Sequence, residues 1–443
     1  MRKSHNPQKT LFCQWSDHRY SQELKSISKI LDGNPEWRDL VTTDLGAGNK
    51  GMSCGAIGMT ADQVLRAAIL KQQNKWSYEF LELQLVDSMM TQSFIRLDFD
   101  ESYSKSTLQE NISKIRGETW IKINEAIVKF ADREGIENGR TVRMDATVVD
   151  SNIHSPTDSL LLFDCFKVAD RIFKKIRKQT RNAYYTPLTT KQAKSEVVKI
   201  QYANSNSDRL EPYKILISNA KSLLKTVKNV VERYKNNKKI DTTKLINIVE
   251  LLPLIISQTV KRVIKGDIVP PDEKVLSIFE SHTDIIIKGR RDIEYGHKVF
   301  LTTGTSGLVT DCQLVQANPA DSEYFIDLLE TQRSIYGRVP RQVAADGGFA
   351  SADNVYDAKD LGVKDVCFSK QVGLEIEEMV KSPWVFQKLR NFRAGIEGII
   401  STLKRGFGLS RVSWKGVSGF ASYVHSAIVA YNLTKIARLQ AQN

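Results

Sequence analysis

The chain has 443 residues, which is too long for one compact core and predicts two or three domains. Hydrophobic residues make up 41% of the chain and charged residues 26%, a composition that excludes pervasive disorder. The net charge of +13 favours a polyanionic partner, either nucleic acid or an anionic membrane surface, although a merely basic soluble protein also fits.

The membrane alternative is weakened by the lack of a run of about 18 apolar residues, so we expect no transmembrane helix and no membrane partner. The basic N-terminus, MRKSHNPQKT, has no apolar stretch behind it, which argues against a secretory signal. The five cysteines are scattered and form no CxxC pair. We therefore expect a reduced, cytoplasmic protein without a disulfide framework or a zinc site.

Helices are predicted for the first third of the chain. Residues 1–56 are polar and predicted to be irregular, ending in a glycine-rich stretch at 46–55. Helical periodicity follows at 61–73, with Thr60 as a candidate N-cap, and further helices are predicted at 76–90 and 106–134. A helical domain over residues 57–140 is compatible with a DNA-docking module or with a scaffolding bundle.

A strand and a basic insertion come next. Residues 141–149 alternate between apolar and other side chains, which predicts a strand. Residues 160–280 are helical and polar, and within 161–240 there are 19 Lys and Arg against 6 Asp and Glu. This segment therefore carries the entire excess charge of the chain. A solvated helix face is the ordinary explanation, but an excess confined to one insertion favours contact with a phosphate backbone.

Strands return after the insertion. Residues 294–303 and 307–316 are joined by a short glycine-containing turn and predict a hairpin. The remaining predicted elements are a helix at 320–336, a strand at 341–348, a helix at 351–361, a strand at 363–370 and helices from about 387 to the end. This order predicts an α/β domain, formed by residues 141–159 and 281–443, in which helices flank a mixed sheet.

Three acidic residues of this domain stand out by position. Asp145 lies inside the first strand, Asp346 lies at the end of the fourth before two glycines, and Glu397 lies on the helix after the fifth. An acid within an apolar strand is costly unless it is paired or metal-bound. Mg²⁺ prefers oxygen ligands, and three carboxylates can hold two ions about 3.5–4 Å apart for phosphoryl transfer.

Each acid also has an ordinary structural explanation. Asp145 can pair with Arg143 on the same face of the strand, and Asp346 can be the first residue of an Asp-Gly turn. Glu397 can pair with Arg393, one helical turn earlier. Spacing alone leaves these alternatives open.

Five strings in this order and spacing resemble the DDE transposases of bacterial insertion sequences, and most closely the ISNCY-like group. The strings are VRMDATVVDSNIHSPTDS, EYGHKVFLTT, GLVTDCQLVQANPADSE, PRQVAADGGFAS and RAGIEGIISTLKRGFGLSRVSWKG. The resemblance covers residues 141–155 and 282–436 in detail and the helical N-terminal region more loosely. It implies a ribonuclease H-like core. The helical N-terminal domain and the helical insertion between the first and second strands are predicted from the residues described above.

The resemblance also implies residue roles. Asp145 of RMDAT, Asp346 of AADGG and Glu397 of RAGIEG match the family's catalytic acids, which bind two Mg²⁺ (or Mn²⁺) ions. The implied activity is cleavage at the element's terminal inverted repeats and strand transfer into target DNA. The implied protein is a homodimer or larger assembly on DNA, in the bacterial cytoplasm at the nucleoid.

Basic residues near Glu397 are candidate DNA ligands. Family members often carry a basic residue seven positions after the glutamate, here Lys404, although an ordinary exposed lysine fits as well. Residues 381–415 carry eight Lys or Arg against one acid, with Trp384 and Trp414 among them. Such a mixture suits DNA contact and base stacking, while half-buried core tryptophans are the ordinary alternative. The candidate DNA-binding residues are Lys404, Arg393, Arg390, Arg405 and Lys415.

Two departures from the family pattern limit what carries over. Some relatives have a Tyr-x-x-Arg-x-x-x-Glu signature, but Arg390 stands where the tyrosine would be. Better-known transposases insert domains just before the glutamate helix, whereas this insertion follows the first strand. Two other functions also remain open: a ribonuclease H-like nuclease or resolvase without strand transfer, and a catalytically inactive DNA-binding relative.

Overall fold

The computed structural model describes residues 15–46, 58–98, 101–180, 182–237, 239–288, 292–369 and 373–442. The described residues form two units, one within Met1–Ser151 and Ile286–Asn443 and the other within Asn152–Ile285. The first unit contains nearly all of the sheet and the helices before and after it, and the second contains the insertion.

Helices precede the sheet in the first unit. They are α1 (Arg19–Gly33), α2 (Glu36–Gly46), α3 (Ala61–Gln73), α4 (Tyr78–Asp87), α5 (Met89–Ile95), α6 (Lys105–Ile112) and α7 (Gly117–Arg133). The prediction of an irregular segment over residues 1–56 is wrong for residues 15–46, which form α1 and α2. Leu24, Ile27 and Leu31 are buried and have helical spacing. The many polar residues between them made this periodicity hard to recognise in the sequence. The glycine-rich stretch beyond Gly46 lies outside the described residues.

Two of the predicted helices are each broken in two. The helix predicted at 76–90 is interrupted at Ser88, whose side chain accepts a hydrogen bond from the Thr91 N–H and caps α5. The helix predicted at 106–134 is interrupted before Gly117, where α7 approaches α16 so closely that an added Cβ would lie 3.1 Å from Ala421 Cβ. The Thr60 N-cap is confirmed, as part of a capping box with Gln63.

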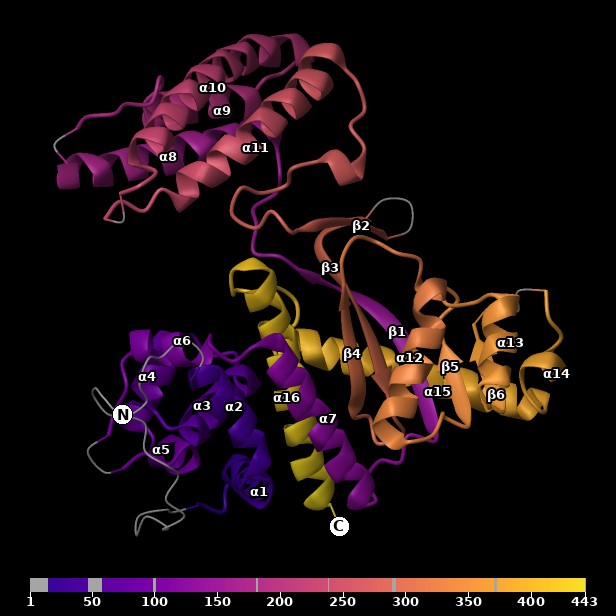
Figure 1. Ribbon diagram of the computed structural model, residues 1–443. Coiled ribbons are helices and arrows are strands. Elements are labelled where there is room, and N and C mark those ends of the chain that lie inside the picture. The colour runs from indigo at the N-terminus through magenta and orange to yellow at the C-terminus, as the bar shows by residue number, and fades with distance from the viewer. Residues whose placement is uncertain are drawn as a thin grey trace. The chain divides into compact units, whose positions relative to one another are not determined.

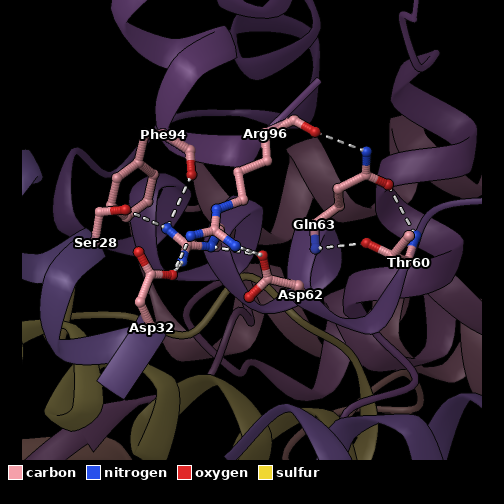
Figure 2. A network of polar contacts seen from close by, with 8 residues as sticks. Ser28, Asp32, Thr60, Asp62, Gln63, Phe94 and Arg96 are labelled. Carbon is pink, nitrogen blue, oxygen red and sulfur yellow. Dashed lines mark hydrogen bonds and ion pairs between the residues drawn. The ribbon is translucent and has the colours of Figure 1, made fainter. Parts of the chain in front are cut away.

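A buried arginine, Arg66, joins three of these helices, and Figure 2 labels its partners Ser28, Asp32, Asp62 and Phe94. The Arg66 side chain on α3 is fully buried, and burial lowers its pKa. Its guanidinium lies 2.8 Å from an Asp62 oxygen and 2.7 Å from an Asp32 oxygen. It also donates to the Ser28 hydroxyl at 2.8 Å and to the Phe94 carbonyl at 3.2 Å. The network links α1, α3 and α5, so these helices are fixed by directional polar contacts as well as by apolar packing.

The sheet has six strands: β1 (Thr141–Asp150), β2 (Asp284–Lys288), β3 (Asp292–Thr303), β4 (Val309–Val315), β5 (Gln342–Ala345) and β6 (Asp365–Phe368). The strand order is β2-β3-β1-β5-β6, with β4 also paired to β3. Strand β1 is antiparallel to β3 and parallel to β5, which is parallel to β6. This mixed sheet is consistent with the ribonuclease H-like expectation. Strand β2 was not predicted, because its short apolar run stands among charged residues, and it makes the strand before Asp346 the fifth rather than the fourth.

Helices after the strands cover the sheet and connect it to the N-terminal helices. They are α12 (Asp321–Tyr336), α13 (Ala352–Asp360), α14 (Ile376–Met379), α15 (Pro383–Gly406) and α16 (Gly416–Gln440). Helix α15 packs on β1, β5 and β6, while α16 lies side by side with α7 (Figure 1). Apolar side chains of α1–α7, α16, β3 and β4 form one continuous core.

The insertion folds as a helical unit of its own. Its helices are α8 (Asp158–Thr180), α9 (Thr190–Gln201), α10 (Asn206–Tyr234) and α11 (Thr243–Thr259), followed by a π-helical turn at Val260–Lys265 and a 3₁₀ turn at Pro271–Glu273. Aliphatic and aromatic side chains from all four helices form its core. The unit therefore has the hydrophobic core that an independently folded insertion requires.

One stretch of this unit departs from the membrane expectation. Thr243–Lys265 is long and apolar enough to cross a membrane by length and composition. Its apolar residues Leu245, Ile248, Leu252 and Ile255 are buried in the core of the unit. The burial covers one side of the helix only, since Ile246 and Leu254 are exposed.

Candidate active site

Strand β1 directs Asp145 toward α15. Side chains alternate along a strand, so Val142 and Met144 enter the core beneath α12 while Arg143 and Asp145 face the other way. The Asp145 side chain is 16% exposed and accepts a hydrogen bond of 2.8 Å from the Ala146 N–H. Burial raises the pKa of Asp145 to about 6, and the neighbouring Asp346 and Glu397 carboxylates act in the same direction.

Strand β5 brings Asp346 to the same part of the sheet. Met144 of β1 is paired with Ala345 of β5, so the residues that follow each of them, Asp145 and Asp346, lie at neighbouring positions on adjacent strands. Asp346 begins a turn, in which its carbonyl accepts from the Phe349 N–H at 3.1 Å. The turn explanation for Asp346 is therefore also correct, and it does not remove its carboxylate from the site.

Helix α15 completes the group with Arg393 and Glu397. The Arg393 guanidinium lies 3.7 Å from Asp145 Oδ2, 3.4 Å from Asp346 Oδ1 and 3.3 Å from Glu397 Oε1. Residues that are far apart in the chain thus converge on one cation. The pairing of Glu397 with Arg393 that the sequence allowed is present, as one of three such contacts.

Arg143 does not take the role that the sequence left open for it. Its guanidinium donates to Thr303 Oγ1 at 2.9 Å and to the Phe392 carbonyl at 2.6 Å. The guanidinium carbon also lies 4.5 Å from the centre of the Phe392 ring. These contacts attach β1 to α15 next to the three carboxylates, so Arg143 positions the helix that carries Glu397.

Gly395 makes this attachment possible. An added Cβ at Gly395 would lie 2.2 Å from Arg143 Nη1, whereas one at Gly398, on the same helix, would meet nothing within 4 Å. Arg143 Nη1 is the end of a flexible side chain, so it can shift at the cost of its hydrogen bond to the Phe392 carbonyl, and we expect Gly395→Ala to lower the free energy of unfolding by about 1 kcal/mol. The matched control Gly398→Ala is expected to raise it by about 0.5–1 kcal/mol, since alanine favours helix. Urea unfolding of both variants checks this, and equal effects would contradict the packing argument.

The carboxylates form a donor set suited to a hard divalent cation. All three offer oxygen ligands only, and their negative charges are concentrated around one positive group. In the described part of the chain, no three His, Cys, Asp or Glu side chains already lie in a metal-binding arrangement. The Arg393 guanidinium occupies the position among the carboxylates where a metal's charge is needed. The residues fit a metal provided that Arg393 moves away from at least two of its partners.

Ser369 was missed by sequence reasoning. It follows β6, and its hydroxyl donates to Asp346 Oδ1 at 3.2 Å. The available signal was a polar residue directly after an apolar strand beside the strand of Asp346.

The structure brings Arg393 to the carboxylates and places the other basic candidates elsewhere on α15 or at the start of α16. Arg390 and Arg405 are exposed on α15, where Lys404 is half-buried. Lys415 is exposed just before α16. Trp414 is half-buried, as expected of an ordinary core tryptophan, whereas Trp384 is 70% exposed.

Residues 287–433 match the family model described as a transposase DDE domain. The matched segment contains Asp346 and Glu397, while Asp145 lies before it. Comparison with curated proteins and with solved structures finds no match. The family match supports a transposase function and a metal-dependent nucleotidyl-transfer enzyme with DNA as its partner.

Proposed function

We propose that this chain is a DNA transposase that binds the ends of an insertion sequence and performs Mg²⁺-dependent DNA cleavage and strand transfer. The observation that supports the proposal is the convergence of Asp145, Asp346 and Glu397 on one guanidinium. Two of these acids lie within the segment that matches the transposase DDE domain.

The three carboxylates would hold two Mg²⁺ or Mn²⁺ ions. When bound, such ions activate the attacking oxygen and stabilise the leaving oxygen of an in-line displacement. The Ala146 N–H and the Ser369 hydroxyl orient the oxygens of Asp145 and Asp346. Arg393 holds the acids together in the metal-free protein, and after release its guanidinium binds a DNA phosphate.

The reaction needs no covalent protein intermediate. Water attacks the phosphodiester at the element end, breaks the bond between phosphorus and the 3′ oxygen, and leaves a 3′ hydroxyl. That hydroxyl then attacks a phosphodiester of the target DNA and replaces its 3′ oxygen. The number of phosphodiester bonds is conserved in the second step, so strand transfer requires no external energy source.

The remaining contacts with DNA are assigned by charge. Arg390, Lys404, Arg405 and Lys415 contact the phosphate backbone away from the acids, on α15 and before α16, and the basic insertion adds another contact surface. The N-terminal helices recognise the terminal inverted repeats. The two ends of the element have to be brought together, so the enzyme acts as a homodimer or larger assembly on DNA in the bacterial cytoplasm.

A strand-transfer assay tests this proposal. Inverted repeats in the DNA that flanks the coding region supply the substrate, used as a pre-cut end together with a target plasmid and Mg²⁺. We expect end and target to be covalently joined. Cut but unjoined DNA would favour the nuclease or resolvase alternative, and binding of ends without any cleavage would favour the inactive relative.

A further inference from the structure

A cleft outside the carboxylate group lies between the N-terminal helices and the start of α16. It has a volume of about 830 Å³ and is lined by the end of α3, the start of α4, part of α6, the segment before α16 and the first turns of α16. All of these elements belong to the same unit. The volume is within the range of about 300–1,000 Å³ that is typical of ligand sites.

A buried lysine faces this cleft. Lys71 on α3 is 6% exposed, and burial lowers its pKa to about 8. Its ammonium lies 4.6 Å from the centre of the Tyr78 ring and 5.8 Å from that of Trp414. Within the described part of the chain, the ammonium makes neither a hydrogen bond nor an ion pair. Attraction to two aromatic rings compensates only in part for the hydration that the Lys71 ammonium loses on burial. An anion bound in the cleft would supply the missing partner.

Other polar groups in the cleft walls also lack partners. Tyr78 Oη and Trp414 Nε1 are buried without a hydrogen-bond partner among the described residues. Helix α16 begins at the cleft, and its N-cap residue Lys415, which is exposed, makes no side-chain cap hydrogen bond. Three lysines line the cleft, of which Lys75 already donates to the Arg405 carbonyl. A long helix carries partial positive charge at its N-terminus, so the walls combine Lys71 and Lys415 with a helix end that favours anions.

We propose that this cleft binds one nucleotide of a DNA strand, with the backbone phosphate on Lys71 and Lys415 and the base against Trp414 or Trp76. The cationic groups favour a phosphate, and the half-buried indole rings offer apolar surface that a free inorganic anion would leave unused. The inference rests on the proposed function, because that function makes DNA the ligand. It adds a contact site that is separate from the metal-binding acids.

DNA binding by the full-length chain in EDTA tests this inference. The probes are a fluorescein-labelled single strand and the corresponding duplex, measured by anisotropy. We expect Lys71→Met to weaken binding of at least one probe about tenfold, the loss of one charged phosphate contact. The control Lys129→Met removes an exposed lysine of α7 outside the cleft and is expected to change affinity by no more than about twofold. Equal affinity of Lys71→Met and the wild-type protein for both probes would overturn the inference.

Thermal unfolding without DNA separates binding from a structural role. Removing a buried, unpaired charge is expected to leave the Tm of Lys71→Met equal to or above that of the wild type. A lower Tm together with unchanged affinity would make Lys71 a packing residue and overturn the inference. A Tm increase with inorganic phosphate in the wild type but not in Lys71→Met, at equal DNA affinity, would assign the cleft to a free anion instead.

Photocrosslinking locates the base. An oligonucleotide containing 5-iododeoxyuridine is expected to crosslink to the peptide carrying Trp76 or Trp414, and crosslinks confined to other peptides would contradict the placement. These experiments use no metal and no cleavage. Failure of strand transfer by a wild-type protein that binds DNA normally would therefore count against the proposed function, and loss of the Lys71 effect would count against the cleft.

Discussion

Replacing Asp346 with Asn is expected to reduce Mg²⁺-dependent cleavage of element-end DNA at least about 10³-fold, as is Asp145→Asn, because about 4 kcal/mol of transition-state stabilisation is lost. The amide keeps the shape of the carboxylate but removes the charge that holds the ions. Single-turnover cleavage at saturating Mg²⁺ measures the effect. Full activity of Asp346→Asn would remove this residue from the catalytic group.

A matched control uses an acid outside the group. Glu377→Gln on α14 makes the same kind of change at an exposed carboxylate. We expect its cleavage rate to stay within about twofold of the wild-type rate, since exposed charges away from the site have small effects. A large loss in this variant would indicate that general charge, rather than ion binding by particular acids, determines activity.

Stability distinguishes lost chemistry from lost folding in Asp145→Asn. The pKa of Asp145 is about 6 in the folded chain and about 4 in an unfolded one. Its contribution to stability is therefore fully present below about pH 4 and is lost as the pH rises through 6. In metal-free buffer at neutral pH we expect the Tm of Asp145→Asn to equal or exceed that of the wild type. A clearly lower Tm would contradict burial as the main cause of the pKa shift.

Two of the three acids of the candidate site were predictable because each has a local signal. Asp145 interrupts the apolar pattern of a strand, and Asp346 combines a strand end with two glycines. Glu397 has no comparable local signal, and it was identified from its string RAGIEG. The contact of Arg393 with both Asp145 and Asp346 was not predictable, because it depends on how α15 lies across β1 and β5. Sequence spacing specifies pairs on one helix but not contacts between elements.

The burial of α3 could not be predicted for a related reason. Its sequence reads as a helix with one apolar face, yet α3 is buried on all sides, including Arg66 and Lys71. Helices α1 and α16, which are far apart in the sequence, both pack against it. A lysine or arginine at helical spacing looks like a surface residue until such long-range packing is known. Both the Arg66 network and the proposed nucleotide cleft follow from this burial.

Arg66→Met is expected to lower the free energy of unfolding by about 3 kcal/mol, because the buried Asp62 loses its nearer cation and keeps Arg96, at 3.5 Å. Asp32 is 42% exposed and also contacts Arg96, so it contributes less to the loss. Urea unfolding followed by circular dichroism measures the change. Arg338→Met is the matched control, since Arg338 lies 3.5 Å from Asp132 in an exposed pair and its loss should cost no more than about 1 kcal/mol.

Removing both partners tests whether the loss comes from the orphaned charge. In the double variant Arg66→Met with Asp62→Leu, no carboxylate is left buried at that position, and apolar side chains occupy the space. We expect the double variant to recover about 1–3 kcal/mol relative to Arg66→Met alone. If the losses instead add, the arginine stabilises the helices mainly through its contacts with Ser28 and Phe94, and the ion pair with Asp62 is secondary.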